Sequence, residues 1–156
     1  MALLTTLSYG GTAAIVTGMG LVVAFDAGTT SRAALVSSLL VVAIADNLAD
    51  SLAIHVYQES ENLPSRRAFR STVANYVTRL MVAGSFALLA LLTPAPSLVP
   101  VVLAWGTALL CTLTYFVARA RGAAPGLEVI KHLAVATFVI MVSKAIGVWI
   151  LAHVSL

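Results

Sequence analysis

Two acidic and two basic side chains stand inside long apolar stretches of this sequence, where an ionised group is unfavourable. Asp46 and Asp50 share one such stretch, and Arg79 and Lys144 each lie in another. On insertion scales an ionisable group at the centre of a bilayer costs at least ~2.5–3.5 kcal/mol, so it faces protein or water. Groups of this kind either hold helices together as ion pairs or line a path for a cation or proton.

One wall of the helix predicted over residues 33–57 is polar from its middle to one end. At about 100° per residue, its polar side chains fall within one half of the helix surface. They are Asp46, Asn47, Asp50, Ser51, His55, Gln58 and Glu61. Carboxylate oxygens suit hard or borderline divalent cations. We therefore predict an ion path of Asp46, Asn47, Asp50 and His55, with Asp46 and Asp50 as metal ligands and Glu59 and Glu61 as weaker ones.

Depth along the helices suggests which charges meet. At ~1.5 Å per residue, Asp50 and Arg79 lie about 10 Å and 9 Å above the predicted cytoplasmic boundary, and Asp46 and Lys144 about 16 Å and 20 Å. These depths predict the ion pairs Asp50–Arg79 and Asp46–Lys144, because lysine has a long stem. Two interpretations stay open. The pairs are a static network, or the acids line a cation path that Lys144 modulates.

The remaining reactive side chains do not form a catalytic set. His55 is a metal ligand or proton relay in one interpretation and an interfacial residue in the other. Cys111 is the single cysteine, which excludes an intrachain disulfide. No nucleophile–base arrangement, phosphate-binding glycine loop or zinc spacing occurs. We predict that the protein is not an enzyme and binds no resident cofactor, although a divalent metal is a candidate cargo.

Composition identifies the class of fold. Of the 156 residues, 60% are hydrophobic and only 10% are charged, whereas soluble domains are about 45–50% apolar and about 25% charged. We expect a single transmembrane domain over residues 1–156, an all-α bundle of five helices embedded in a lipid bilayer. The predicted spans are residues 3–25, 33–57, 73–92, 99–118 and 127–152.

The basic residues predict an orientation for these spans. They gather in the second–third and fourth–fifth connections, and the list is Arg66, Arg67, Arg70, Arg119 and Arg121, with Lys131 close by. Five spans place both connections on the side of the N-terminus. The positive-inside rule then puts the N-terminus in the cytoplasm and the C-terminus outside. The few basic residues indicate orientation rather than nucleic-acid binding, which needs a clustered basic surface.

Local signals add detail to this topology. Gly10, Ala14 and Gly18 form a ridge of small residues, which predicts close helix packing inside the bundle or, alternatively, a homodimer seam. Ser31 is expected to cap the second span. Pro100 is expected in the first turn of the fourth span, where proline is tolerated.

Three stretches, in order, resemble the vacuolar iron transporter family of five-span divalent-metal exporters. The second span reads Ala45-Asp46-Asn47-Leu48-Ala49-Asp50-Ser51-Leu52-Ala53-Ile54-His55, where the family has Ala-Asp-x-Leu-Ser-Met-Gly-x-Gly-Glu-Tyr. The stretch from Ser85-Phe86 to Pro94-Ala95-Pro96 is similar to the end of the family's third span. Lys144-Ala145-Ile146-Gly147 stands where the family has Tyr-x-x-Gly.

The resemblance implies exchange of iron or manganese for protons, a homodimer, and a place in a bacterial or archaeal cytoplasmic membrane. Only Asp46 carries over by identity. Three family residues are replaced here: an aspartate by Tyr9, a methionine by Asp50 and a glutamate by Ile54. The family's acidic insert between the second and third spans is reduced to about fifteen residues. We therefore predict a metal–proton exchanger that uses the polar wall; the alternative is a non-transporting scaffold or partner subunit with permanent ion pairs.

Overall fold

The computed structural model describes residues 2–27 and 31–154, with side chains described from Gly10 onward. Every regular element in this part of the chain is helical. The elements are α1 (Ala2–Ala27), α2 (Arg32–Val41), the π-helical turn η1 (Val42–Asp46), α3 (Asn47–Ser60), α4 (Ser65–Leu92), α5 (Ala95–Ala120) and α6 (Pro125–His153). Because η1 continues α2 directly into α3, the three form one 29-residue helical segment, Arg32–Ser60.

Five helical segments are long and apolar enough to cross a membrane, in agreement with the predicted number of spans. A helix needs about 20 apolar residues to cross ~30 Å of hydrocarbon, and the four segments after α1 each have 26 to 29 residues. Large apolar side chains remain exposed along them, among them Leu48, Met81 and Phe138. The bundle thus has an apolar exterior, as a protein surrounded by lipid requires.

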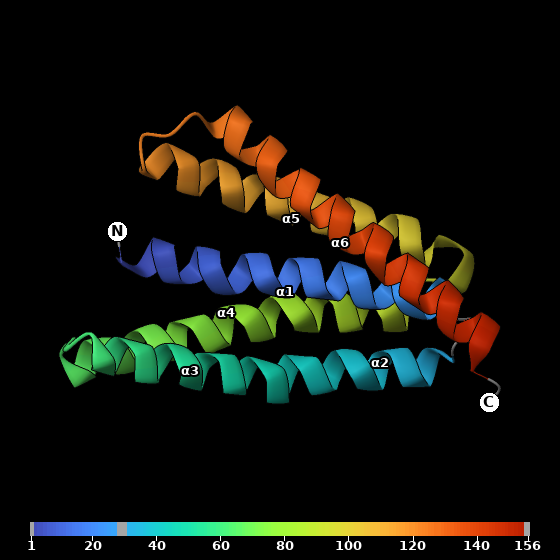
Figure 1. The fold of residues 1–156 in the computed structure, drawn as a ribbon, viewed down its shortest axis with the longest axis horizontal. Coiled ribbons are helices and arrows are strands. Elements are labelled where there is room, and N and C mark those ends of the chain that lie inside the picture. The colour runs from blue at the N-terminus through green and yellow to red at the C-terminus, as the bar shows by residue number, and fades with distance from the viewer. Residues whose placement is uncertain (1, 28–30, 155–156) are drawn as a thin grey trace.

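Helix α1 is the centre of the bundle (Figure 1). It contacts α2 and α4 on one side and α5 and α6 on the other. The small-residue ridge faces α4: Ala14 is buried, and a Cβ at Gly18 would lie 2.6 Å from the Phe86 ring. The ridge therefore serves internal packing and is not available as a homodimer seam, which settles that alternative.

One end of the bundle carries most of the arginines. The start of α1, the α3–α4 turn and the α5–α6 connection lie at this end, and the C-terminal end of α6 lies at the other (Figure 1). We call it the arginine-rich end, and its arginines are Arg66, Arg67, Arg70, Arg119 and Arg121. The five-span prediction likewise required the second–third and fourth–fifth connections to lie at the same end as the N-terminus.

One predicted position was wrong, and one predicted span belongs to a longer helix. Helix α4 begins at Ser65, so residues 65–72 form helix before the predicted span 73–92, with Ala68 fully buried. Helix α5 begins at Ala95, so Pro100 lies inside it rather than in its first turn. Pro96, near the helix start, is the proline in a position without an intrahelical N–H partner. The Ser31 cap is confirmed, since its Oγ accepts from the Ala34 N–H.

Candidate functional site

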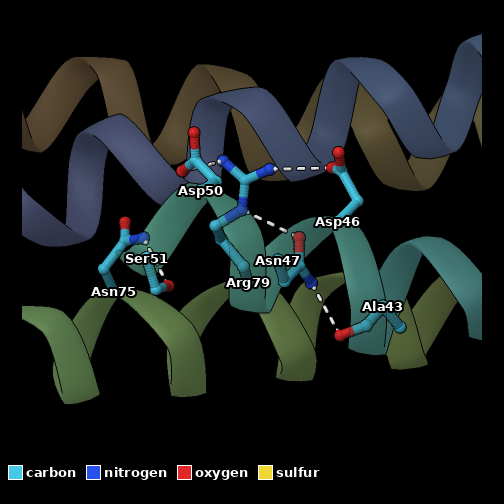
Figure 2. A network of polar contacts seen from close by, with 7 residues as sticks. All are labelled: Ala43, Asp46, Asn47, Asp50, Ser51, Asn75 and Arg79. Atoms are coloured by element: carbon cyan, nitrogen blue, oxygen red, sulfur yellow. Dashed lines mark hydrogen bonds and ion pairs between the residues drawn. The ribbon is translucent and has the colours of Figure 1, made fainter. Parts of the chain in front are cut away.

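The candidate site is built around the guanidinium of Arg79, which α4 directs at the η1–α3 segment (Figure 2). Its Nη1 donates to Asp50 Oδ2 at 2.9 Å, its Nη2 to Asp46 Oδ2 at 3.3 Å, and its Nε to Asn47 Oδ1 at 2.8 Å. Arg79 is only 5% exposed. One buried cation thus binds two carboxylates, and we call Asp46, Asp50 and Arg79 the charge cluster.

The two carboxylates of the charge cluster differ in exposure. The side chain of Asp50 is 28% exposed and that of Asp46 is 58% exposed. Both accept from Arg79 through Oδ2. Asp46 therefore presents a carboxylate edge to the outside of the bundle, while Asp50 is the more enclosed partner. Two negative charges and one positive charge leave the cluster with one formal negative charge.

A change of helix type coincides with the site. The π-helical turn η1 ends at Asp46, and the backbone N–H of the next residue, Asn47, bonds to the Ile44 and Val42 carbonyls. The Asn47 side chain donates to the Ala43 carbonyl at 2.9 Å and so orients its own oxygen toward Arg79. π-Helical turns of this kind are rare and occur often at functional sites. Here the turn determines how Asp46 and Asn47 face α4.

A second layer of polar contacts lies one helical turn away. Asn75 Nδ2 donates to Ser51 Oγ at 3.0 Å, and both side chains are almost fully buried. Gly10 of α1 packs directly on this layer, since a Cβ there would overlap Asn75 Oδ1 and lie 2.9 Å from Arg79 Cγ. The absence of a side chain at position 10 therefore allows α1 to cover the polar residues of α4.

Asn75 was not among the predicted site residues. The signal was present in the sequence, because Asn75 precedes Arg79 by four residues and so shares its helix face. Ser51 follows Asn47 by the same spacing on the opposing helix. Matching the two i, i+4 pairs across neighbouring helices would have found the second layer.

Of the two predicted ion pairs, Asp50–Arg79 is present and Asp46–Lys144 is not. Asp46 bonds to Arg79 instead. Lys144 is exposed on α6, which packs against α1 and α5 and has no contact with η1 or α3. Similar depth was not enough to bring the two residues together, because α1 separates their helices.

The predicted outer residues form a separate group at the arginine-rich end. His55 Nε2 lies 3.4 Å from Glu59 Oε1, and His55 Nδ1 lies 3.2 Å from Thr72 Oγ1. Glu61 is exposed in the α3–α4 turn. Within residues 2–27 and 31–154, no three His, Cys, Asp or Glu side chains gather as a metal site. His55 and Glu59 are therefore paired with each other rather than with the charge cluster.

Comparison with protein families, curated proteins and solved structures finds no match for this chain. The resemblance to vacuolar iron transporters stays a prediction that rests on the motif residues alone. The side chain of Tyr9, which replaces a family aspartate, lies outside the described residues. Any functional proposal therefore depends on the chemistry of the charge cluster.

Proposed function

We propose that this chain is an integral membrane protein that moves cations or protons across the bilayer through the charge cluster. In this proposal all five helical segments span the membrane, with the N-terminus in the cytoplasm and the C-terminus outside. The apolar exterior and the position of the arginine-rich end support this orientation. The site lies deep in the membrane, because Asp46 is the central residue of the segment Arg32–Ser60.

The observation that carries the proposal is the unequal charge around Arg79. A single buried guanidinium contacts two carboxylates, so the charge cluster retains one negative charge in a low-dielectric environment. An unbalanced charge of this kind is unfavourable in hydrocarbon. Binding of one proton or one monovalent cation compensates it, and binding of a divalent cation changes the net charge to one positive charge. A cluster that is completed by a mobile positive charge is suited to carrying that charge.

We assign the entry of this charge to Asp46, which requires that the exposed face of η1 borders water or a second copy of the chain rather than lipid. Its contact with Arg79 is longer than that of Asp50, and its side chain is the more exposed. An incoming cation that binds Asp46 competes only with Nη2, while Nη1 and Nε keep Arg79 bound to Asp50 and Asn47. The site therefore accepts and releases a cation without losing the α3–α4 contact.

The proposed cargo is a divalent metal ion, iron or manganese, in exchange for protons. Carboxylate oxygens suit such ions, and the motif resemblance around Asp46 implies the same cargo. Arg79 stands between the two carboxylates, so both bind a single metal ion only after Nη2 leaves Asp46. In this exchange one proton neutralises the cluster whenever the metal is absent, with Arg79 in contact with both carboxylates.

A proteoliposome assay tests the proposal. Wild-type protein is expected to couple a manganese gradient to proton movement, and Asp46→Asn is expected to reduce this flux at least tenfold because it removes the exchangeable charge. Asp26→Asn is the matched control, since Asp26 is an exposed carboxylate at the end of α1 outside the cluster. If Asp46→Asn combined with Asp50→Asn leaves the flux unchanged, these residues are not the path.

A second candidate is a non-transporting scaffold or partner subunit. It is favoured by the fixed position of Arg79, since each of its three nitrogen atoms donates to an α3 or η1 side chain. A permanent network of this kind predicts that manganese does not change the melting temperature of the wild-type protein. A transporter predicts stabilisation by manganese that Asp46→Asn abolishes.

A further inference from the structure

The arginine-rich end carries a second feature that the proposed ion path does not use. Helix α4 has 28 residues, which at ~1.5 Å each is about 42 Å, or about 12 Å longer than the hydrocarbon core of a bilayer. The apolar part of the helix begins near Val73. Residues 65–72 therefore extend through the headgroup layer, provided that the chain is inserted as proposed above.

Two arginines in this extension point away from the bundle. Ala68 is fully buried and marks the inward face of the helix. At about 100° per residue, Arg66 and Arg70 both stand about 160° from Ala68 around the helix axis. Both are exposed, and among the described residues neither has an acidic side chain as a partner.

The outward face of α4 that carries Arg66 and Arg70, here called the outward stripe, continues into the lipid-facing part of the helix. Val73, Val77 and Met81 lie about 140° to 180° from Ala68 by the same spacing, and they are 44%, 45% and 71% exposed. Arg70 and Arg66 then stand about 5 Å and 10 Å beyond the apolar boundary along this stripe. Each headgroup layer is about 5–8 Å thick, so Arg70 lies at the level of the lipid phosphates. Arg66 lies just beyond that layer, from where its long side chain can reach back to it.

Aromatic side chains at the same end agree with this level. Tyr57 near the end of α3 is 64% exposed. Phe69, next to Arg70 in the sequence, is 62% exposed, and its ring makes a T-shaped contact with the His55 ring. Aromatic residues are enriched at membrane interfaces, where an apolar ring meets polar headgroups. Exposed aromatic rings and unpaired guanidinium groups at the same end supply the apolar part and the cationic part of a headgroup-binding site.

We infer that Arg66 and Arg70 bind the phosphate of an anionic phospholipid in the cytoplasmic leaflet. Guanidinium groups bind phosphate oxygens in paired hydrogen bonds. The acids of the nearby turn do not block the surface, because Glu59 contacts His55 and Glu61 makes no ion pair with either arginine. The bound lipid would anchor the α3–α4 end and hold it at a defined depth.

Native mass spectrometry of the full chain with phosphatidylglycerol or phosphatidylcholine tests this inference. Each arginine near an anionic surface contributes about a fivefold gain in affinity, so Arg66→Gln with Arg70→Gln is expected to weaken phosphatidylglycerol binding roughly 30-fold. Phosphatidylcholine binding is expected to stay unchanged. Arg66→Lys with Arg70→Lys keeps the charge but loses the paired hydrogen bonds, and it is expected to retain only part of the preference.

The matched control is Arg119→Gln with Arg121→Gln, which removes the same charge from the same end but from the end of α5. It is expected to lose much less binding than the α4 variant. Equal losses in the two variants would overturn the inference, because general charge rather than the α4 stripe would then attract the lipid. Wild-type protein without a preference for phosphatidylglycerol at low salt would overturn it as well. Neither readout depends on ion flux, so failure here is distinct from failure of the proposed transport.

Discussion

Arg79 on α4 and Lys144 on α6 are both basic residues deep inside apolar helices, but their surroundings are opposite. Arg79 is buried, and all three of its nitrogen atoms donate to side chains of the neighbouring segment. Lys144 is exposed, and its helix packs only on α1 and α5. The contrast teaches that the depth of a charge in a span does not determine its partner. The partner is determined by the helix face on which the charge lies.

The strongest test of this contrast between Arg79 and Lys144 is to replace each of the two residues. Arg79→Met is expected to lower the free energy of unfolding by about 3–5 kcal/mol, because it leaves Asp46 and Asp50 without a counter-charge. Lys144→Met is expected to leave the free energy of unfolding unchanged or raise it, since an exposed ammonium is unfavourable where α6 spans a membrane as proposed. Unfolding in mixed detergent micelles, followed by circular dichroism, measures both. A loss as large in Lys144→Met would mean that Lys144 has an acidic partner within the chain.

Helix packing on α4 and α6 can be compared by glycine substitutions on the two helices. A Cβ at Gly147 of α6 would overlap the Ala24 carbonyl of α1, which is backbone and cannot rotate away. Gly147→Ala is therefore expected to destabilise the bundle by about 1–3 kcal/mol. Gly84→Ala is the matched control, because no atom lies within 4 Å of that position. It is expected to be neutral or to stabilise α4 by up to about 1 kcal/mol, so equal losses in both variants would contradict the packing of α6 on α1.

The smallest effect separates the two acids of the charge cluster. Double-mutant cycles with Arg79→Met are expected to give about 1–3 kcal/mol of coupling for Asp50, whose charged hydrogen bond is short and largely enclosed. Asp46 is expected to couple by about 1 kcal/mol or less, because its contact is longer and more exposed. The cycles use Asp50→Asn and Asp46→Asn in the same micelles. A larger coupling for Asp46 would argue against its role as the exchangeable charge.

Several parts of the fold followed from local patterns. The number of apolar segments was predicted correctly, because hydrocarbon thickness and helical rise together define the length of a span. The Asp50–Arg79 pair was predicted because the two residues lie near the same end of neighbouring spans, where a depth estimate has little error. The Ser31 cap depends only on residues close in sequence.

Other parts required knowledge of neighbours. The sequence did not predict that α4 begins at Ser65, before the predicted span 73–92, because most of residues 65–72 are polar, and polarity alone does not distinguish a loop from a polar helical extension. The π-helical turn η1 has no local composition signal. It is found where Asp46 and Asn47 face Arg79.

The sequence by itself determined that this protein consists of apolar helices, how many can cross a bilayer, and that its buried charges need partners. These properties depend on composition and on spacing along a single helix. Only the tertiary structure decided which charges meet, because that depends on the order of the helices around α1. With α1 between α3 and α6, Arg79 reaches both carboxylates and Lys144 reaches neither.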